Sequence, residues 1–118
     1  YVQAHQCAAR YDRQTSEFEA TNLTECFGSI LAPYLQEASV QIGLKLTERI
    51  DIQCNNTHMI IGEIVEVFID SKFIEHDGTV NHENAGSLTV AGLDSYHKTK
   101  KLSRLSYPKV GTLPHDLL

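Results

Sequence analysis

One stretch of the sequence, AGLDSYHKTKKLSRLSY at residues 91–107, brings together side chains that could do chemistry. It holds an acid, a tyrosine and a histidine in quick succession, followed by three lysines and an arginine. Phenol and imidazole groups donate and accept hydrogen bonds, and lysine and arginine supply positive charge. Such a run fits three interpretations: a solvated basic face, a nucleic-acid-binding patch, or part of a small-molecule pocket.

The charge of the whole chain bears on the nucleic-acid interpretation. The formal net charge is −5, which argues against a bulk attraction to nucleic acid. Four of the ten Lys and Arg residues lie in the stretch 91–107. Nucleic-acid binding would therefore depend on a local basic patch. A solvated basic face is the favoured interpretation of the stretch.

The six histidines raise the question of a metal site. His76 and His82, with Glu75 and Asp77 nearby, could gather a cation. No HxH or HExxH spacing sets two imidazoles on one face, however. Exposed loop histidines are the favoured interpretation, and we predict no metal site.

Two further kinds of motif find little support. Cys7 lies two residues after His5, and on a helix side chains at i and i+2 point apart, which disfavours a Cys–His nucleophile pair. The sequence has neither GxGxxG nor GxxxxGK[ST], the two common phosphate-binding loops. A bound phosphate would need Arg10, Lys98 or a hydroxyl such as that of Thr99.

The most regular pattern in the chain is an alternation of period two that begins at Ser39. Apolar and polar residues alternate through VQIGLKLT, which is typical of a half-buried strand, and a shift at Glu48-Arg49 fits a bulge. The turn-forming CNNT at 54–57 leads into MIIGEIVEVFID, whose apolar run indicates a central strand covered on both sides. The sequence therefore predicts a long antiparallel hairpin.

Short helices are expected before the hairpin. Residues 1–11 have few turn formers and fit the last turns of a helix. Thr15 or Ser16 can cap a short helix over SEFEA, and Asn22 fits its end. Pro33 disfavours a continuous helix, so the segment around it is expected to be a loop.

Beyond the hairpin the pattern is less regular. Asp77-Gly78 is a turn pair, and Asn81 can cap a short helical turn. Residues 101–107 are predicted to form a final strand, which Pro108 ends. Three or four strands close no barrel by themselves, so their edges need a cover, either a partner subunit or an N-terminal portion of the protein.

The composition fits one globular domain over residues 1–118, with 42% hydrophobic and 21% charged residues. Three scattered cysteines, odd in number, favour a reducing cytoplasm over a disulfide framework. No apolar run approaches the roughly 20 residues that cross a membrane. Because the sequence opens on Tyr1 without a targeting signal, we expect a processed chain or a fragment.

Four stretches, in order between His5 and Val110, resemble the flavin reductase-like family, whose fold is the FMN-binding split barrel. They are HQCAARYDRQTSEFEATNLT, ASVQIGLKL, HMIIGEIVEVFID and DGTVNHENAGSLTVAGLDSYHKTKKLSRLSYPKV. The resemblance implies a mainly β fold, an antiparallel split β-barrel that is incomplete here, with short helices. It also implies the C-terminal portion of such a domain, since the family's first strands precede the position of Tyr1.

The same resemblance implies an FMN-binding oxidoreductase of flavin reductase type, in which hydride passes from NAD(P)H to the flavin. Family members are similar in being homodimers that hold FMN, or in some cases FAD, near the subunit interface. The alternative is a flavin-binding or dimerisation module without efficient NAD(P)H turnover. Neither a nucleic acid nor a membrane is implied as a partner.

The resemblance also places cofactor-binding residues in the first and last stretches. They are Gln6, Ala8, Arg10, Ser95, Tyr96 and His97. Tyr96 is expected to cover an edge of the flavin ring, with His97 or Lys98 as a donor or positive charge nearby. The competing interpretations are dimer-interface packing for Tyr96 and a surface ion pair for Arg10.

Two departures from the family pattern limit this transfer. Cys7-Ala8 replaces a Thr-Ser pair of the family, which removes two hydroxyls. The family's histidine position before the signature strand falls on Thr57, so we assign His58 no role in nicotinamide binding.

Overall fold

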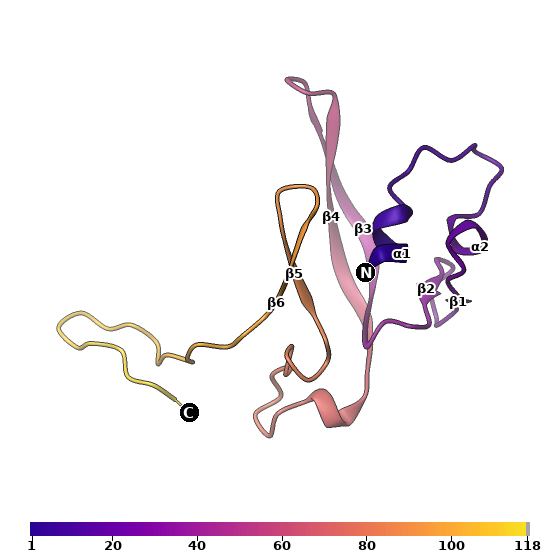
Figure 1. Ribbon diagram of the computed structural model, residues 1–118. Helices are drawn as coiled ribbons and strands as arrows, with labels where there is room; N and C mark the ends of the chain where they lie inside the picture. Colours follow the sequence, from indigo (N-terminus) through magenta and orange to yellow (C-terminus); the bar gives the residue numbers. More distant parts are fainter. Residues whose placement is uncertain (118) are drawn as a thin grey trace.

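The computed structural model describes residues 1–117. The chain is mainly β with a few short helices, and its strands form three separate antiparallel pairs, β1–β2, β3–β4 and β5–β6 (Figure 1). These pairs do not close into a barrel within the described residues. In chain order the elements are α1 (Val2–Gln6), α2 (Glu17–Thr21), β1 (Glu25–Cys26), β2 (Tyr34–Leu35), β3 (Val40–Ile52), β4 (Thr57–Ile69), the 3-10 helix η1 (Ser71–Phe73), β5 (Leu88–Ala91) and β6 (Ser95–Lys98).

The long hairpin predicted from the alternation is confirmed as β3–β4, with 13 residues in each strand. Its turn places Asn56 in the left-handed region, with φ of 54°, as the asparagines predicted. One register shift lies between Leu46 and Glu48, next to the predicted bulge, and leaves Thr47 unpaired. A second shift, beside Gly43 and Leu44, was not predicted.

The pairing register gives the β3–β4 hairpin two unlike faces. One face is apolar, and we call it the open face; it carries Ile42, Leu44, Leu46, Ile64 and Val67. All five side chains are exposed, so the expectation of a strand covered on both sides is wrong for the described chain. The reason is that β4 pairs with β3 alone and no other described element packs over this face.

One end of the other face is covered by the segment that holds Ser29 and Tyr34. We call these two residues, together with Gly43, Glu66 and Phe68 of the hairpin, the closed corner. The carboxylate of Glu66 accepts hydrogen bonds from the Tyr34 hydroxyl at 2.6 Å and the Ser29 hydroxyl at 2.5 Å. The rings of Tyr34 and Phe68 meet edge to face at 5.4 Å. Gly43 leaves the room that the Tyr34 hydroxyl occupies, because a Cβ there would lie 2.0 Å from that oxygen.

The closed corner also shifts the titration of its two ionisable groups. Hydrogen bonds from Ser29 and then from Tyr34 lower the pKa of Glu66 below its ordinary value of 4.5. Burial, followed by the hydrogen bond to Glu66, raises the pKa of Tyr34 to about 12. Both shifts favour a carboxylate that accepts from a neutral phenol.

The N-terminal helices follow local sequence signals. The side chain of Ser16 accepts a hydrogen bond from the backbone N–H of Glu19, and Asn22 ends α2 with φ of 55°, so the predicted cap and stop are confirmed. Gln3 of α1 donates through Nε2 to the backbone carbonyls of Thr21, at 2.9 Å, and Asn22, at 3.1 Å. These bonds hold α1 against the end of α2.

The C-terminal region differs from the prediction. The turn at Asp77-Gly78 and the Asn81-capped turn are present, the latter through a 2.9 Å bond from the Asn84 N–H to the Asn81 side chain. The predicted strand over 101–107 is wrong, because β6 covers Ser95–Lys98 and is paired with β5. Beyond it, Thr99, Lys101 and Arg104 contact residues 77–87. The chain then forms a projecting arm, residues 105–117, which carries isolated bridges.

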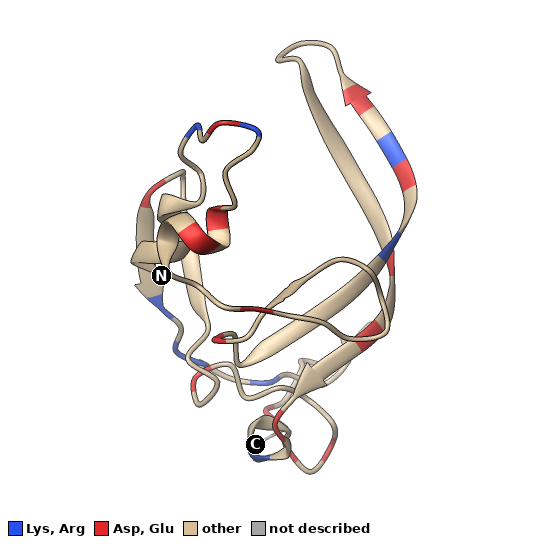
Figure 2. Cartoon of the chain, turned by 90° about the vertical axis from the view of Figure 1, so that its right-hand side faces the viewer, with Lys and Arg blue, Asp and Glu red and all other residues tan. Residues whose placement is uncertain are grey.

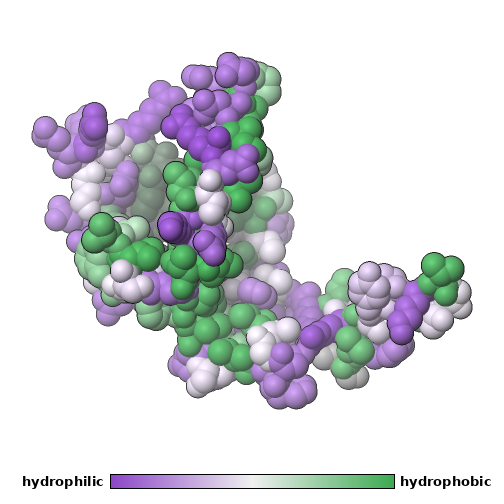
Figure 3. All heavy atoms as spheres, turned by 180° about the vertical axis from the view of Figure 1, so that it is seen from behind, coloured by the Kyte–Doolittle hydropathy of each residue, from purple (hydrophilic) through white to green (hydrophobic). Residues whose placement is uncertain are grey.

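The molecule is open in shape. Its radius of gyration is 18.1 Å, against about 13.5 Å for a compact domain of this length. Its accessible area is 10054 Å², against about 6,400 Å² for a folded monomer of this mass. Among residues 1–117 the buried side chains are Thr21, Tyr34 and Ala85. Apolar residues form a broad band across the molecule and further patches on the arm (Figure 3).

Candidate functional site

The first and last stretches singled out in the sequence meet where α1 contacts β6. Nδ1 of His5 lies 2.9 Å from the hydroxyl of Tyr96, a hydrogen bond between residues 91 apart in sequence. The ring of Tyr1 lies against Tyr96 with centroids 5.1 Å apart and planes tilted by 39°. His5 meets the same ring edge-on at 5.6 Å. We call Tyr1, His5 and Tyr96 the aromatic junction.

Local structure explains this arrangement. Tyr1 and His5 are four residues apart, which puts them on one face of the helical turn that His5 closes by donating its N–H to the Tyr1 carbonyl at 2.8 Å. Side chains alternate along β6, so Tyr96 points to one face of the β5–β6 hairpin while Ser95 and His97 point to the other. The junction therefore gathers one of the three adjacent β6 residues.

The remaining predicted residues lie around the junction without joining it. Gln6 donates through Nε2 to the Tyr11 hydroxyl at 3.3 Å. Ala8 and Arg10 are exposed in the segment that follows α1. Ser95 donates to the carboxylate of Asp94 at 3.2 Å, and exposed His97 pairs in register with Thr89 of β5.

Sequence reasoning missed Tyr1 and His5 as members of the site. Their spacing of four residues was the available signal, since it places two ring side chains on one helical face. Nothing local in the sequence indicated that Tyr96, on a distant strand, would lie against that face.

Two residues of the basic stretch that follows β6 contact acidic side chains. Arg104 forms an ion pair with Asp77, and the backbone N–H of Lys101 donates to Glu83. A cavity of about 480 Å³ lies between these two segments. Residues 95–115 carry five Lys and Arg and no acidic residue, whereas basic and acidic residues are interspersed along β3 (Figure 2).

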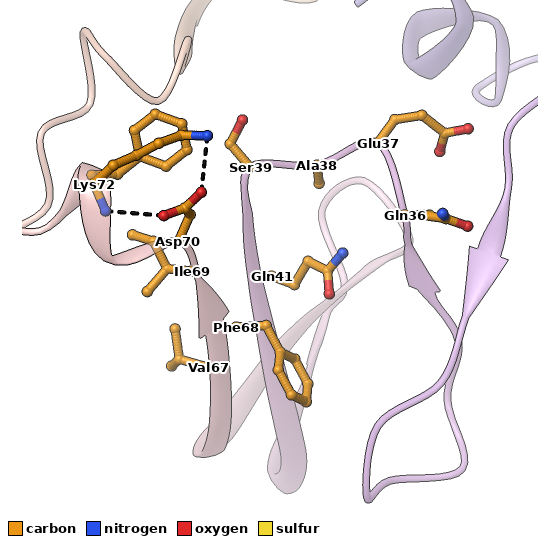
Figure 4. Close-up of a pocket in the computed structure, with 11 residues that line it drawn as sticks. Gln36, Glu37, Ala38, Ser39, Gln41, Val67, Phe68, Ile69, Asp70 and Lys72 are labelled. Atoms are coloured by element: carbon orange, nitrogen blue, oxygen red, sulfur yellow. Dashed lines mark hydrogen bonds and ion pairs between the residues drawn. The ribbon is translucent and has the colours of Figure 1, made fainter.

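A larger groove, of about 610 Å³, lies between the segment before β3 and the end of β4 with η1 (Figure 4). Four of its polar side chains, those of Glu37, Gln41, Asp70 and Lys72, bind other groups of the chain. Glu37 accepts from the Thr24 N–H at 3.0 Å, a hydrogen bond that lowers the pKa of Glu37. Gln41 donates to a backbone carbonyl of β2 at 2.7 Å, and Asp70 pairs with the Lys72 ammonium at 2.9 Å. These interactions stabilise the base of the β3–β4 hairpin.

The side chains near α1 and β6 are of the chemical types that bind a flavin. A planar heteroaromatic ring needs aromatic faces, which the aromatic junction supplies. A phosphate needs positive charge and hydrogen-bond donors. Arg10 and Lys98 carry positive charge and His97 has a ring N–H, and all three are exposed on the two segments that meet there. Within the described residues no group of three or more His, Cys, Asp or Glu side chains is placed to hold a metal ion.

No helix among residues 1–117 combines the length and apolar character needed to span a bilayer.

Comparison with known proteins gives matches among solved structures. A candidate flavin reductase with a split barrel domain, from Shewanella frigidimarina, is 39% identical and superposes with a TM-score of 0.85 over 92% of this chain and 55% of its own. The flavoredoxin of Desulfovibrio vulgaris is 25% identical, with a TM-score of 0.66 over 92% of this chain and 57% of its own. The 2-nitrobenzoate 2-nitroreductase of Pseudomonas fluorescens, 22% identical with a TM-score of 0.75 over 95% of this chain and 56% of its own, shares the fold.

No protein-family model matches the chain, and no curated protein sequence matches it. The chain spans little more than half the length of the solved structures that it resembles. Those structural neighbours are flavin reductase-like split-barrel proteins.

Proposed function

We propose that this chain is part of an FMN-binding oxidoreductase of flavin reductase type, which passes hydride from NAD(P)H to the flavin. The observation that supports this most is the match to the candidate flavin reductase at 39% identity and a TM-score of 0.85. The match includes 92% of the chain. FMN is the proposed cofactor, with FAD as the second choice.

The flavin, when bound, supplies the hydride-accepting ring, so the protein needs little acid–base chemistry. The residues of this chain have the tasks of stacking, orienting and charge neutralisation. Tyr96 and the rings around it offer the stacking surface. Arg10, His97 and Lys98 are the proposed donors toward phosphate or ring oxygens, and Gln6, Ala8 and Ser95 complete the predicted set.

We further propose that the chain acts as a homodimer that covers the open face. The accessible area of 10054 Å² exceeds the area of about 6,400 Å² expected of a folded monomer, so the chain exposes more surface than a compact protein of its mass. The exposed residues Ile42, Leu44 and Ile64 form the continuous apolar surface that such an interface requires.

A reducing compartment such as the cytoplasm is the proposed location. Cys7, Cys26 and Cys54 are all free thiols, which fits that environment.

Two measurements test the proposed function. Quenching of FMN fluorescence on titration with the protein measures binding, and loss of NADH or NADPH absorbance with added FMN measures turnover. Binding together with turnover supports a flavin reductase. Binding without turnover supports the alternative, a flavin-carrying module. If the protein neither binds FMN nor oxidises NAD(P)H in its presence, the proposal fails.

A further inference from the structure

The aromatic junction has an internal order that assigns different tasks to its three rings. Tyr96 is half-buried, with Tyr1 lying against it and His5 meeting its edge. Tyr1 is 69% exposed. Within residues 1–117, Tyr1 is therefore the outer ring of the stack, and Tyr96 lies behind it.

His5 determines how Tyr96 is held. Its Nδ1 lies 2.9 Å from the Tyr96 hydroxyl, so a neutral His5 whose proton is on Nε2 accepts a hydrogen bond from the phenol. This bond and the edge-on ring contact fix both the hydroxyl and the plane of Tyr96. A fixed inner ring in turn supports the tilted ring of Tyr1, 5.1 Å away.

We propose that Tyr1 presents the stacking face for a planar heteroaromatic ligand, that Tyr96 backs it, and that His5 is a positioning residue acting through Tyr96. This inference rests on the proposed function and reassigns the stacking role within it. The ligand chemistry is a flat ring system, supplied either by the isoalloxazine of a flavin or by the rings of a nicotinamide dinucleotide.

The test measures binding of three probes, riboflavin, FMN and NADH, to the same set of variants. Tyr1→Leu keeps apolar bulk and removes the π face, and we expect it to weaken binding of the ring-bearing probe about fivefold to tenfold. Tyr96→Phe keeps the ring and removes the bond to His5, for which we expect a loss of about threefold. Tyr107→Leu is the matched control, because Tyr107 is 85% exposed on the distant arm.

His5 variants separate positioning from simple packing. His5→Asn retains an acceptor at the place of Nδ1 and is expected to bind close to wild type. His5→Phe retains a ring and loses the acceptor, and is expected to match Tyr96→Phe. Near-UV circular dichroism of the ligand-free variants reports whether the ring stack persists, so a folding defect is recognised separately.

The outcomes distinguish this inference from the proposed function. Losses shared by riboflavin and FMN identify the flavin ring as the stacked group, and losses confined to NADH identify the nicotinamide dinucleotide. If wild type oxidises NAD(P)H with FMN while Tyr1→Leu binds every probe as wild type does, the stacking inference alone is overturned. If the variants weaken flavin binding but wild type turns over no NAD(P)H, the reductase proposal alone is overturned. If wild type binds none of the probes, both are overturned.

Discussion

The two faces of the β3–β4 hairpin are built from the same strands and are completed in opposite ways. At the closed corner, the Tyr34 hydroxyl donates a hydrogen bond to the Glu66 carboxylate, and Gly43 leaves space for the phenol. On the open face, Leu44, Ile64 and their neighbours are in contact with solvent. The closed corner shows that this chain can complete its own packing where it provides a covering segment. The open face therefore depends on another surface, which we propose is a second subunit.

Among substitutions at the closed corner and the open face, filling the space at Gly43 is expected to lower the stability of the folded chain most. Gly43→Ala puts a Cβ 2.0 Å from the Tyr34 hydroxyl and 2.7 Å from Glu66 Cγ, so the closed corner must open. We expect a loss of about 1–3 kcal/mol in the free energy of unfolding, measured by urea denaturation. Gly62→Ala is the comparison variant, since its nearest contact is the Leu44 Cβ at 3.0 Å. Equal stability of the two variants would contradict the prediction.

A smaller effect is expected from Tyr34→Phe. The ring contact with Phe68 remains, while Glu66 loses its 2.6 Å hydrogen bond from the phenol. We expect the Tm to fall by a few degrees in a calorimetric scan, because a bond to a carboxylate is lost and no cavity is created. Tyr107→Phe, at an exposed site on the arm, is expected to leave the Tm unchanged. An equal fall in both variants would show that the closed corner is not the cause.

The closed corner should also make stability depend on pH at both ends of the scale. The pKa of Glu66 is lowered in the folded chain, so its contribution is present above pH 4.5 and is lost as the pH falls through the lowered value. The pKa of Tyr34 is raised, so its contribution is present below pH 10.0 and is lost as the pH rises toward about 12.

Unfolding measured across pH checks both limbs. Glu66→Gln should flatten the acid limb, and Tyr34→Phe should flatten the alkaline limb. A wild-type acid limb that survives unchanged in Glu66→Gln would assign it to other carboxyl groups.

The smallest effect on the folded chain is expected on the open face. Leu44 is 53% exposed, so Leu44→Gln should change the free energy of unfolding of the monomer by no more than about 0.5 kcal/mol. The same change should weaken self-association, measured by sedimentation velocity, because it puts an amide in the proposed interface. Leu113→Gln, the same substitution at a site on the arm that is 89% exposed, is the control for the added amide. Loss of monomer stability without a change in association would argue that the open face packs within the chain.

Local signals predicted the features whose causes lie within a few residues. The alternation after Ser39 predicted the hairpin, and Ser16 and Asn22 predicted the limits of α2. The closed corner was not predicted, because Tyr34 and Glu66 are 32 residues apart and no periodicity connects them. Gly43 held an available hint, since a glycine within an alternating strand often marks the close approach of another group.

The error at the C-terminal strand came from a segment with weak periodicity. The apolar residues in 101–107 predict a strand, whereas the paired strand is the polar Ser95–Lys98, which the β5 partner specifies through cross-strand pairing. For the candidate site, the sequence identified the two segments that meet, and the structure determined which ring of each faces the other. Strand alternation separates Tyr96 from Ser95 and His97, a geometric consequence that depends on knowing where β6 begins.

The hydrogen bond between His5 and Tyr96 has a consequence for the order in which the chain folds. It closes a loop of 91 residues, whereas the β3–β4 hairpin pairs residues that are close in sequence. Distant contacts carry a larger entropic cost of closure and tend to form after local ones. We expect the hairpin to be native-like in the folding transition state. We expect the aromatic junction to form only after the transition state has been crossed. Mutations at the junction should then speed unfolding and leave the refolding rate unchanged.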